Sequence, residues 1–117
     1  MTDAGSPVRN VEWIGPDRQS VVVEAAGDID LHRSADFQKK LLELPLDKLA
    51  KIVVDLSGVP YMDSSGVASL VKLLARVRRG PGALKLAALT PRVRSVFEIT
   101  RLDSVFDIAA SEEEAMG

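Results

Sequence analysis

The sequence has no cysteine, few aromatic residues and a single histidine. Without cysteine, neither a disulfide framework nor a thiolate metal site can form. Because His32 is the only imidazole, a histidine-rich metal site is excluded too, although carboxylate oxygens could still bind a hard cation such as Mg²⁺. Aromatic residues make up 4% of the chain, so the core must be built mainly from aliphatic side chains.

The sequence also lacks a strong charge imbalance and any long apolar run. The formal net charge is -2, which is too small to favour nucleic acid as the main partner. No apolar run approaches the roughly 20 residues of a membrane-spanning helix. The opening stretch MTDAGSPVRN lacks the basic and apolar segments of a secretory signal. We therefore expect a cytoplasmic protein that binds neither nucleic acid nor a membrane directly.

The length of 117 residues and the hydrophobic content of 46% are typical of one compact domain. Residues 1–7 are small and polar, and we expect them to be flexible, with the domain spanning residues 8–117. Residues 8–15 and 20–27 have the alternation and β-branched content of strands. The Gly-Pro-Asp connection between them predicts a hairpin.

The rest of the chain alternates between helical and strand patterns. Three further strands are predicted at residues 51–58, 83–89 and 104–109. Apolar side chains at helical spacing predict four helices, at residues 35–44, from Val67 to the glycines at 80–82, after Thr90-Pro91, and after Ser111. Residues 27–34 are predicted to be the loop before the first helix. The sequence therefore predicts an α/β domain with a mixed sheet, an N-terminal hairpin and about four α-helices.

Nucleotide-binding and hydrolase motifs are not present. Neither glycine-rich phosphate-binding pattern occurs, and Ser64 and Ser65 are not in the frame of a nucleophile elbow. His32 could serve as a base only if its loop met Ser64, and a lone loop histidine is far more often solvated than catalytic. We therefore expect that the protein is not an enzyme and that it needs no cofactor.

Two groups of charged residues have alternative interpretations. Asp28, Asp30 and Asp63 lie in loops and could bind Mg²⁺ or act in acid–base chemistry, but loop acids more often cap helices and form turns. A basic stretch late in the second predicted helix has no interleaved aromatics, so a solvated helix face is favoured over a nucleic-acid patch; it comprises Lys72, Arg76, Arg78 and Arg79.

The stretch YMDSSGV, residues 61–67, places an acid and two hydroxyls just ahead of a predicted helix. Aspartate and serine are favoured N-caps, and on local physics capping is the favoured role. Only one residue can be the cap, so part of the cluster is spare. A phosphate at this position would meet free N–H groups and the positive end of the helix dipole. Phosphorylation would then add charge at a docking surface without unfolding the domain.

Beyond these local arguments, VVDLSGVPYMDSSGVASLVKLL, residues 53–74, resembles the signature of STAS domains (sulphate-transporter and anti-sigma-antagonist domains), and in particular of the bacterial anti-anti-sigma factors. GDIDLHRSADF, residues 27–37, and the segment 84–108 resemble the family as well. The resemblance runs from about Val21 to the end of the chain. It implies a single STAS-like domain.

The resemblance also implies a function and the residues that perform it. The unphosphorylated protein would bind an anti-sigma factor that is also a serine kinase, freeing the sigma factor, and a PP2C-type phosphatase would reverse the phosphorylation. Ser64 matches the phosphoacceptor, and the residues matching the contact surface are Asp28, Asp30, Asp63, Ser65, Gly66 and Val67. The free protein is expected to be a monomer. Related domains also serve in stress-signalling assemblies and as accessory subunits of lipid ABC transporters, which remains the alternative.

Overall fold

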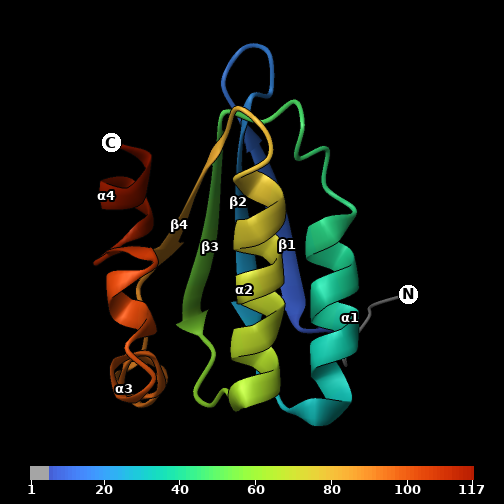
Figure 1. The fold of residues 1–117 in the computed structure, drawn as a ribbon. Helices are drawn as coiled ribbons and strands as arrows, with labels where there is room; N and C mark the ends of the chain where they lie inside the picture. The colour runs from blue at the N-terminus through green and yellow to red at the C-terminus, as the bar shows by residue number, and fades with distance from the viewer. Residues whose placement is uncertain (1–5) are drawn as a thin grey trace.

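The computed structural model describes residues 6–117, in which five strands and four α-helices alternate along the chain (Figure 1). The strands are β1 (Val8–Ile14), β2 (Ser20–Ala26), β3 (Lys51–Gly58), β4 (Ala83–Ala87) and β5 (Asp107–Ala109). The helices are α1 (Leu31–Leu42), α2 (Ser64–Val77), α3 (Pro91–Ile99) and α4 (Glu112–Met116), with a short 3₁₀ helix at Leu102–Ser104. The predicted order of strands and helices is confirmed.

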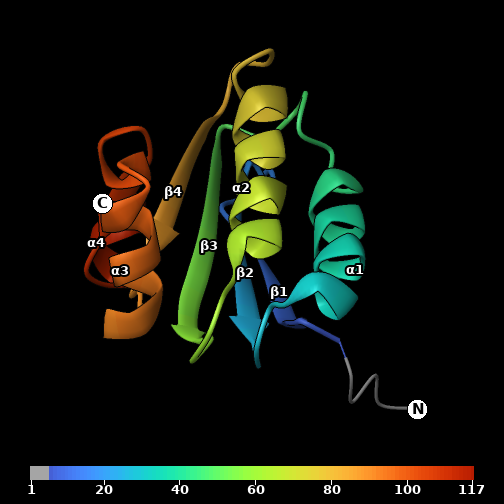
Figure 2. The same cartoon turned by 60° about the horizontal axis from the view of Figure 1, so that its bottom comes forward.

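The strands form one sheet in the order β1-β2-β3-β4-β5. β1 and β2 form the predicted antiparallel hairpin, and every other neighbouring pair is parallel. Helices α1 and α2 lie side by side over one face of the sheet (Figures 1 and 2). Because β2 and β3 are parallel, they end at the same edge of the sheet. The helices that follow them, α1 and α2, therefore begin at this edge.

The apolar core has a large and a small part, on opposite faces of the sheet. Val23 and Val54 belong to the large cluster under α1 and α2, whereas Val22 and Val53 belong to a small cluster that includes Ala115 of α4. Successive side chains of a strand point to opposite faces, so α4 covers the face away from α1 and α2. The central strands are buried on both sides, which accounts for their nearly continuous apolar sequence.

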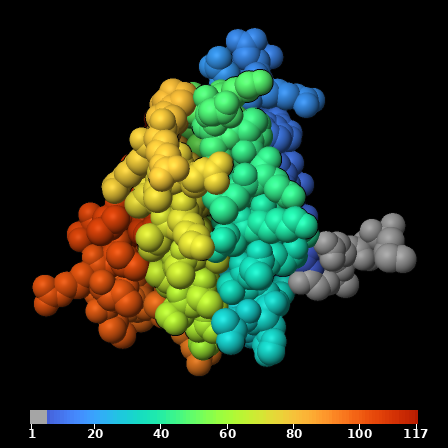
Figure 3. Space-filling model, turned by 45° about the vertical axis from the view of Figure 1, so that its right-hand side comes forward, coloured from blue at the N-terminus to red at the C-terminus, as the bar shows by residue number. Residues whose placement is uncertain are grey.

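The space-filling view shows that the side chains of α1 and α2 meet along most of their length (Figure 3). Phe37 and Leu41 of α1, one helical turn apart, are both buried, as the apolar stripe predicted.

No helix within residues 6–117 is both long and apolar enough to cross a membrane.

Both helices over the sheet begin earlier than predicted. α1 starts at Leu31 rather than at residue 35, and α2 starts at Ser64 rather than at Val67. The apolar stripe is visible only after the first turn of each helix, whereas the preceding aspartates, Asp30 and Asp63, set the true starts by capping. The prediction that residues 27–34 form a loop is therefore wrong for its last four residues.

Two smaller predictions also differ from the structure. The strand predicted at 83–89 ends at Ala87, because Ala88 has a left-handed backbone with φ 57°. The strand predicted at 104–109 is shortened to Asp107–Ala109 by the preceding 3₁₀ helix.

Of the segment predicted to be flexible, residues 1–5 lie outside the described residues. The carbonyl of Pro7 accepts a hydrogen bond from Ala26 N–H at 2.9 Å.

Candidate functional site

Two loops lie side by side at the edge of the sheet where β2 and β3 end. A parallel bridge between Ile29 and Met62 joins them. The N–H of Ile29 donates to the carbonyl of Tyr61 at 2.9 Å, and the N–H of Asp63 donates to the carbonyl of Ile29 at 3.2 Å. The side chains of Ile29 and Met62 are buried. This bridge fixes the starts of α1 and α2 next to each other (Figure 2).

Each loop ends on an aspartate that caps the helix after it. The carboxylate of Asp30 accepts hydrogen bonds from the backbone N–H groups two and three residues later, at 3.0 and 3.2 Å. The carboxylate of Asp63 does the same at 2.9 and 3.3 Å. The sequence left open whether an aspartate or a serine would cap the second helix. The structure assigns that role to Asp63, and α2 begins at Ser64 rather than at Ser65, the start that the family resemblance implies.

The two serines that follow Asp63 are in different situations. The Ser65 hydroxyl donates to the Asp63 carboxylate, and Ser65 is only partly exposed. Ser64 is exposed, and its hydroxyl forms no hydrogen bond with any other residue in the range 6–117. Ser64 is also the first residue of α2, at the positive end of the helix dipole. An incoming group could therefore reach Ser64 more readily than Ser65.

The hydrogen bonds to the Asp63 carboxylate also determine the ionisation of this group, which precedes Ser64. The Ser65 hydroxyl, together with the backbone N–H groups, holds the pKa of Asp63 below its usual value of 3.8. Asp63 is therefore ionised at neutral pH and places a negative charge next to the Ser64 hydroxyl. The first turn of α2 itself contains no acidic residue, so the negative charge directly preceding Ser64 comes from the cap, Asp63.

Gly66 and Val67 lie beneath this surface. A Cβ atom at Gly66 would come within 2.6 Å of Met62 Cγ and 2.9 Å of Ile29 Cγ2, so glycine allows α2 to sit directly on the bridged loops. Val67 is 5% exposed and belongs to the main core. Their part in partner binding remains a prediction, and it would act through packing because both residues are buried.

The remaining predicted residues lie around Ser64. Asp30, Asp63 and Ser65 are partly exposed, and Asp28 is exposed. We call the exposed groups of Asp28, Asp30, Asp63, Ser64 and Ser65 the Ser64 surface. The guanidinium of Arg33 donates to the carbonyl of Asp28 at 3.0 Å and so helps to hold the first loop. The structure thus places all five predicted polar residues on the two bridged loops and the first turn of α2.

Sequence patterns misplaced one residue that supports this surface. The apolar spacing from Val67 onward predicts that Ser69 faces water, but it is 2% exposed. Its hydroxyl contacts the carbonyls of Ser34 in α1, at 3.2 Å, and of Ser65, at 3.1 Å. α2 is covered by α1 as well as by the sheet, so its buried face is wider than a single stripe. By contrast Val71, which the same apolar spacing predicts to be buried, is 41% exposed.

Other contacts tie the second loop to α3. Thr90 precedes the first residue of α3, as predicted, but its hydroxyl does not cap the helix. It donates instead to the carbonyl of Val59 at 2.9 Å. The guanidinium of Arg92 lies over the ring of Tyr61, with 5.5 Å between Cζ and the ring centroid. No local pattern signals these contacts, because their partners are some thirty residues apart.

Within residues 6–117, no group of three potential metal ligands lies at the Ser64 surface. A shallow hollow lies at the other end of α2, lined by residues that include Leu74, Val77, Leu84 and Val105. A group of three carboxylates, Glu24, Asp55 and Glu112, is found within residues 6–117 on the sheet face away from α2. Asp28, Asp30 and Asp63, considered above as a possible Mg²⁺ site, do not form such a group in this part of the chain.

Comparison with known proteins places this arrangement in a family. The family model described as the STAS domain matches residues 12–115. The chain belongs to the STAS domain family. It is 34% identical over 93 residues to the anti-sigma-B factor antagonist of Bacillus subtilis, an alignment that covers 80% of this chain and 84% of that protein. The predicted family and its fold, with the N-terminal hairpin and mixed sheet, are confirmed.

Solved STAS structures show the same fold. A crystal structure of an anti-sigma factor antagonist from Mycobacterium paratuberculosis has a TM-score of 0.77 and 21% identity, and the match covers 92% of each chain. The anti-sigma factor antagonist SpoIIAA in its unphosphorylated form has a TM-score of 0.67 and 24% identity, over 92% of this chain and 93% of that one. At these identities the likeness concerns the fold of the STAS domain.

We expect Asp63→Ala to lower the free energy of unfolding of this STAS domain by about 1 kcal/mol, because the start of α2 loses its cap. Urea unfolding at neutral pH would measure the loss, and Asp30→Ala should cost a similar amount at α1. Because the pKa of Asp63 is lowered from 3.8, its contribution is complete above that value and fades as the pH falls. The difference between wild type and Asp63→Ala should therefore shrink in acid.

Asp28→Ala is the matched control for both cap variants, because Asp28 is exposed and caps no helix. It should change the unfolding free energy by less than about 0.5 kcal/mol. An Asp63→Ala protein as stable as the wild type would contradict the capping role.

Proposed function

We propose that this STAS domain is an anti-sigma factor antagonist and that phosphorylation of Ser64 switches its binding off. The observation that carries the proposal is the exposed, unpartnered Ser64 hydroxyl at the first position of α2. The 34% sequence identity between this chain and an anti-sigma-B factor antagonist supports the same function. The partner would be an anti-sigma factor that is also a serine kinase.

The position of Ser64 suits a reversible modification. A phosphate there would face the positive end of the helix dipole, so α2 would tolerate it, although the Asp63 carboxylate already accepts hydrogen bonds from the N–H groups of Ser65 and Gly66. It would also add a charge of about -1.5 to -2 next to the ionised Asp63. A partner docked over the Ser64 surface would have to accommodate that charge, and binding would weaken. The domain itself would stay folded.

The chemistry of phosphoryl transfer would come from the partner. A serine hydroxyl is a weak nucleophile at neutral pH and needs a base, a phosphate donor and a metal ion held in place. His32, the only imidazole, is exposed on α1, and it is the backbone N–H of this residue, not its ring, that donates to the Asp30 carboxylate. The kinase would therefore supply ATP, Mg²⁺ and the catalytic base, and a PP2C-type phosphatase would reset the antagonist.

Mass spectrometry of the protein isolated from its native cells tests this proposal directly. We expect a fraction of the intact protein to carry one phosphate and fragment ions to place it on Ser64. Affinity purification of the unphosphorylated protein should recover a small ATP-binding kinase. Phosphate mapped to Ser65 would move the switch by one residue. Recovery of transporter subunits, with no phosphate under any growth condition, would contradict the proposal.

A further inference from the structure

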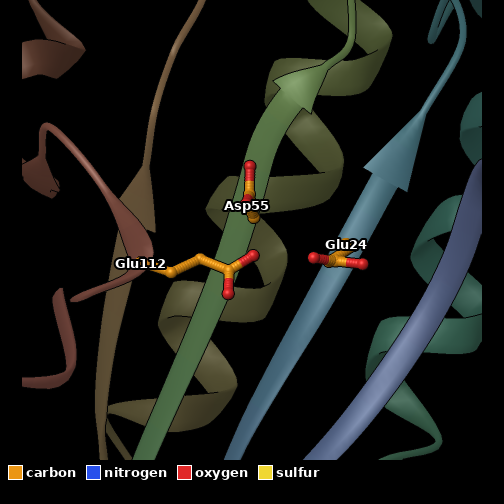
Figure 4. Close-up of side chains that lie close together, drawn as sticks. All are labelled: Glu24, Asp55 and Glu112. Carbon is orange, nitrogen blue, oxygen red and sulfur yellow. The ribbon is translucent and has the colours of Figure 1, made fainter.

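Three carboxylates meet on the face of the sheet that α1 and α2 do not cover (Figure 4). Glu24 comes from β2, Asp55 from β3 and Glu112 from the first position of α4, and one oxygen of each lies within 4.8 Å of the others. Asp55 is 7% exposed, and the other two are partly buried. Three negative charges at this spacing repel one another, so a proton bound by the cluster stabilises it.

The proton belongs mainly to Glu112. Burial opposes the ionisation of Asp55, but hydrogen bonds from Glu112 and Ser57 outweigh it and lower the pKa of Asp55 below its usual value of 3.8. For Glu112, the hydrogen bond to Asp55, burial and the hydrogen bond to Glu24 act together and raise its pKa to about 8. Protonated Glu112 can donate to Asp55, whereas ionised Glu112 can only repel it.

The other charged groups near the cluster do not neutralise Glu112. On β1, Arg9 lies 3.8 Å from Glu24, and the register of the hairpin puts Glu12 on the same face. The Lys51 ammonium of β3 is directed to the carbonyl of Met116, at 2.7 Å. On the neighbouring strands Lys85 pairs with Asp107 at 3.9 Å. Helix α4 contributes the positive end of its dipole, which favours ionisation of Glu112, and two further acids, Glu113 and Glu114.

Helix α4 depends on these contacts for its position. It has only five residues, far fewer than an isolated helix needs to be stable in water. It is held by the buried Ala115, by the Lys51 hydrogen bond and by Glu112 in the carboxylate cluster. Loss of one of these three contacts is therefore enough to change how much of the time α4 is docked.

We propose that α4 is a proton-operated latch, which stays docked on the sheet while Glu112 shares a proton with Asp55 and Glu24 and detaches when that proton is lost. Because the pKa of Glu112 rises from 4.5 to about 8 on docking, the proton stabilises the docked form fully in acid. This contribution decreases as the pH rises above 4.5 and is lost above about 8. Detachment would uncover Val53, Ala87 and Ala109.

The latch is independent of the proposed Ser64 switch, because the two lie on opposite faces of the sheet. Methyl signals in ¹³C–¹H spectra test it, since methyl groups, unlike amides, do not exchange with water at high pH. We expect the signals of Ala115 and Met116 to move to disordered positions as the pH rises from about 6 to about 9, with Ala87 and Ala109 changing over the same range. Signals from the main core should not move.

Two variants connect this transition to the cluster. Glu112→Gln keeps a hydrogen-bond donor but cannot ionise, so its α4 signals should stay at docked positions to the highest pH. Glu24→Gln removes one repelling charge, so the midpoint should move to lower pH. Glu113→Gln is the control on the same helix, because Glu113 is exposed and outside the cluster, and it should leave the midpoint unchanged.

The latch is overturned if α4 stays docked, or stays undocked, over the whole pH range in the wild type. It is also overturned if Glu112→Gln undergoes the same transition at the same midpoint. A further arm uses calcium or magnesium chloride and, separately, a chelator. If either treatment shifts the wild-type transition, the cluster binds a cation and protonation alone does not control α4.

Discussion

Ser64→Asp is expected to weaken binding to the proposed anti-sigma partner by about 30-fold, or about 2 kcal/mol, because an unpaired negative charge added to the proposed interface opposes docking. The added carboxylate would stand at the first position of α2, beside the ionised Asp63. Attraction to the helix dipole and repulsion from Asp63 act in opposite directions, so the unfolding free energy should change by less than about 1 kcal/mol. Titration calorimetry and urea unfolding would measure the two effects separately.

The control for Ser64→Asp is Ser104→Asp, which adds the same charge at an exposed serine in the 3₁₀ helix. It should leave binding unchanged. Ser64→Ala should bind like the wild type but remain bound when ATP is added, because no phosphate can be transferred. If Ser64→Asp and Ser104→Asp bound equally well, the Ser64 surface would not be the interface. If Ser64→Ala were still released by ATP, the phosphoacceptor would be another residue.

Gly66→Val is expected to lower the free energy of unfolding by about 3 kcal/mol, since it inserts a branched side chain where even one carbon is too close. The nearest atoms are Met62 Cγ, at 2.6 Å from the added Cβ, Ile29 Cγ2 at 2.9 Å and the Ile29 carbonyl at 3.1 Å. Met62 can rotate away, but Ile29 is branched at Cβ and its carbonyl belongs to the bridged loops. Partner binding should fall as well, because the two loops would separate.

A comparison of Gly66→Ala with Gly66→Val distinguishes the effect of packing from that of helix propensity at this position. Alanine is the best helix former, so Gly66→Ala would stabilise the domain by about 1 kcal/mol if propensity dominated. We expect it instead to destabilise the domain by about 1 kcal/mol, and less than valine does. Ala68→Val, at an exposed position of the same helix, is the control and should cost less than about 1 kcal/mol. A stabilised Gly66→Ala protein would contradict the close approach.

The Ser64 switch and the α4 latch would act on different surfaces of one sheet. β3 connects them, because it carries Asp55 on the face under α4 and leads through the second loop to Asp63 and Ser64. The backbone of that loop is held by hydrogen bonds to Ile29 and Thr90, so we expect the two devices to operate separately. Measuring partner binding of Glu112→Gln, which should match the wild type, checks this.

Local sequence signals determined most of the fold. The β-branched runs, the Gly-Pro-Asp turn and the helical spacing gave the correct order of strands and helices and the hairpin, because burial on one face imposes a period on each element. They placed the helix starts late, since an apolar period cannot show a polar first turn. The candidate site was also found from the sequence, where an acid and two hydroxyls preceded a helix and a long motif resembled one family.

Only the tertiary structure decided which structural role each of these residues has. It made Asp63 the cap and bound Ser65 to it, which left Ser64 free, and it buried Ser69 against α1. It also brought together Glu24, Asp55 and Glu112, which are 31 and 57 residues apart in sequence. Such contacts depend on how distant strands and helices pack against one another. The sequence by itself shows only the local preferences of each segment, which depend on residues close to it in the chain.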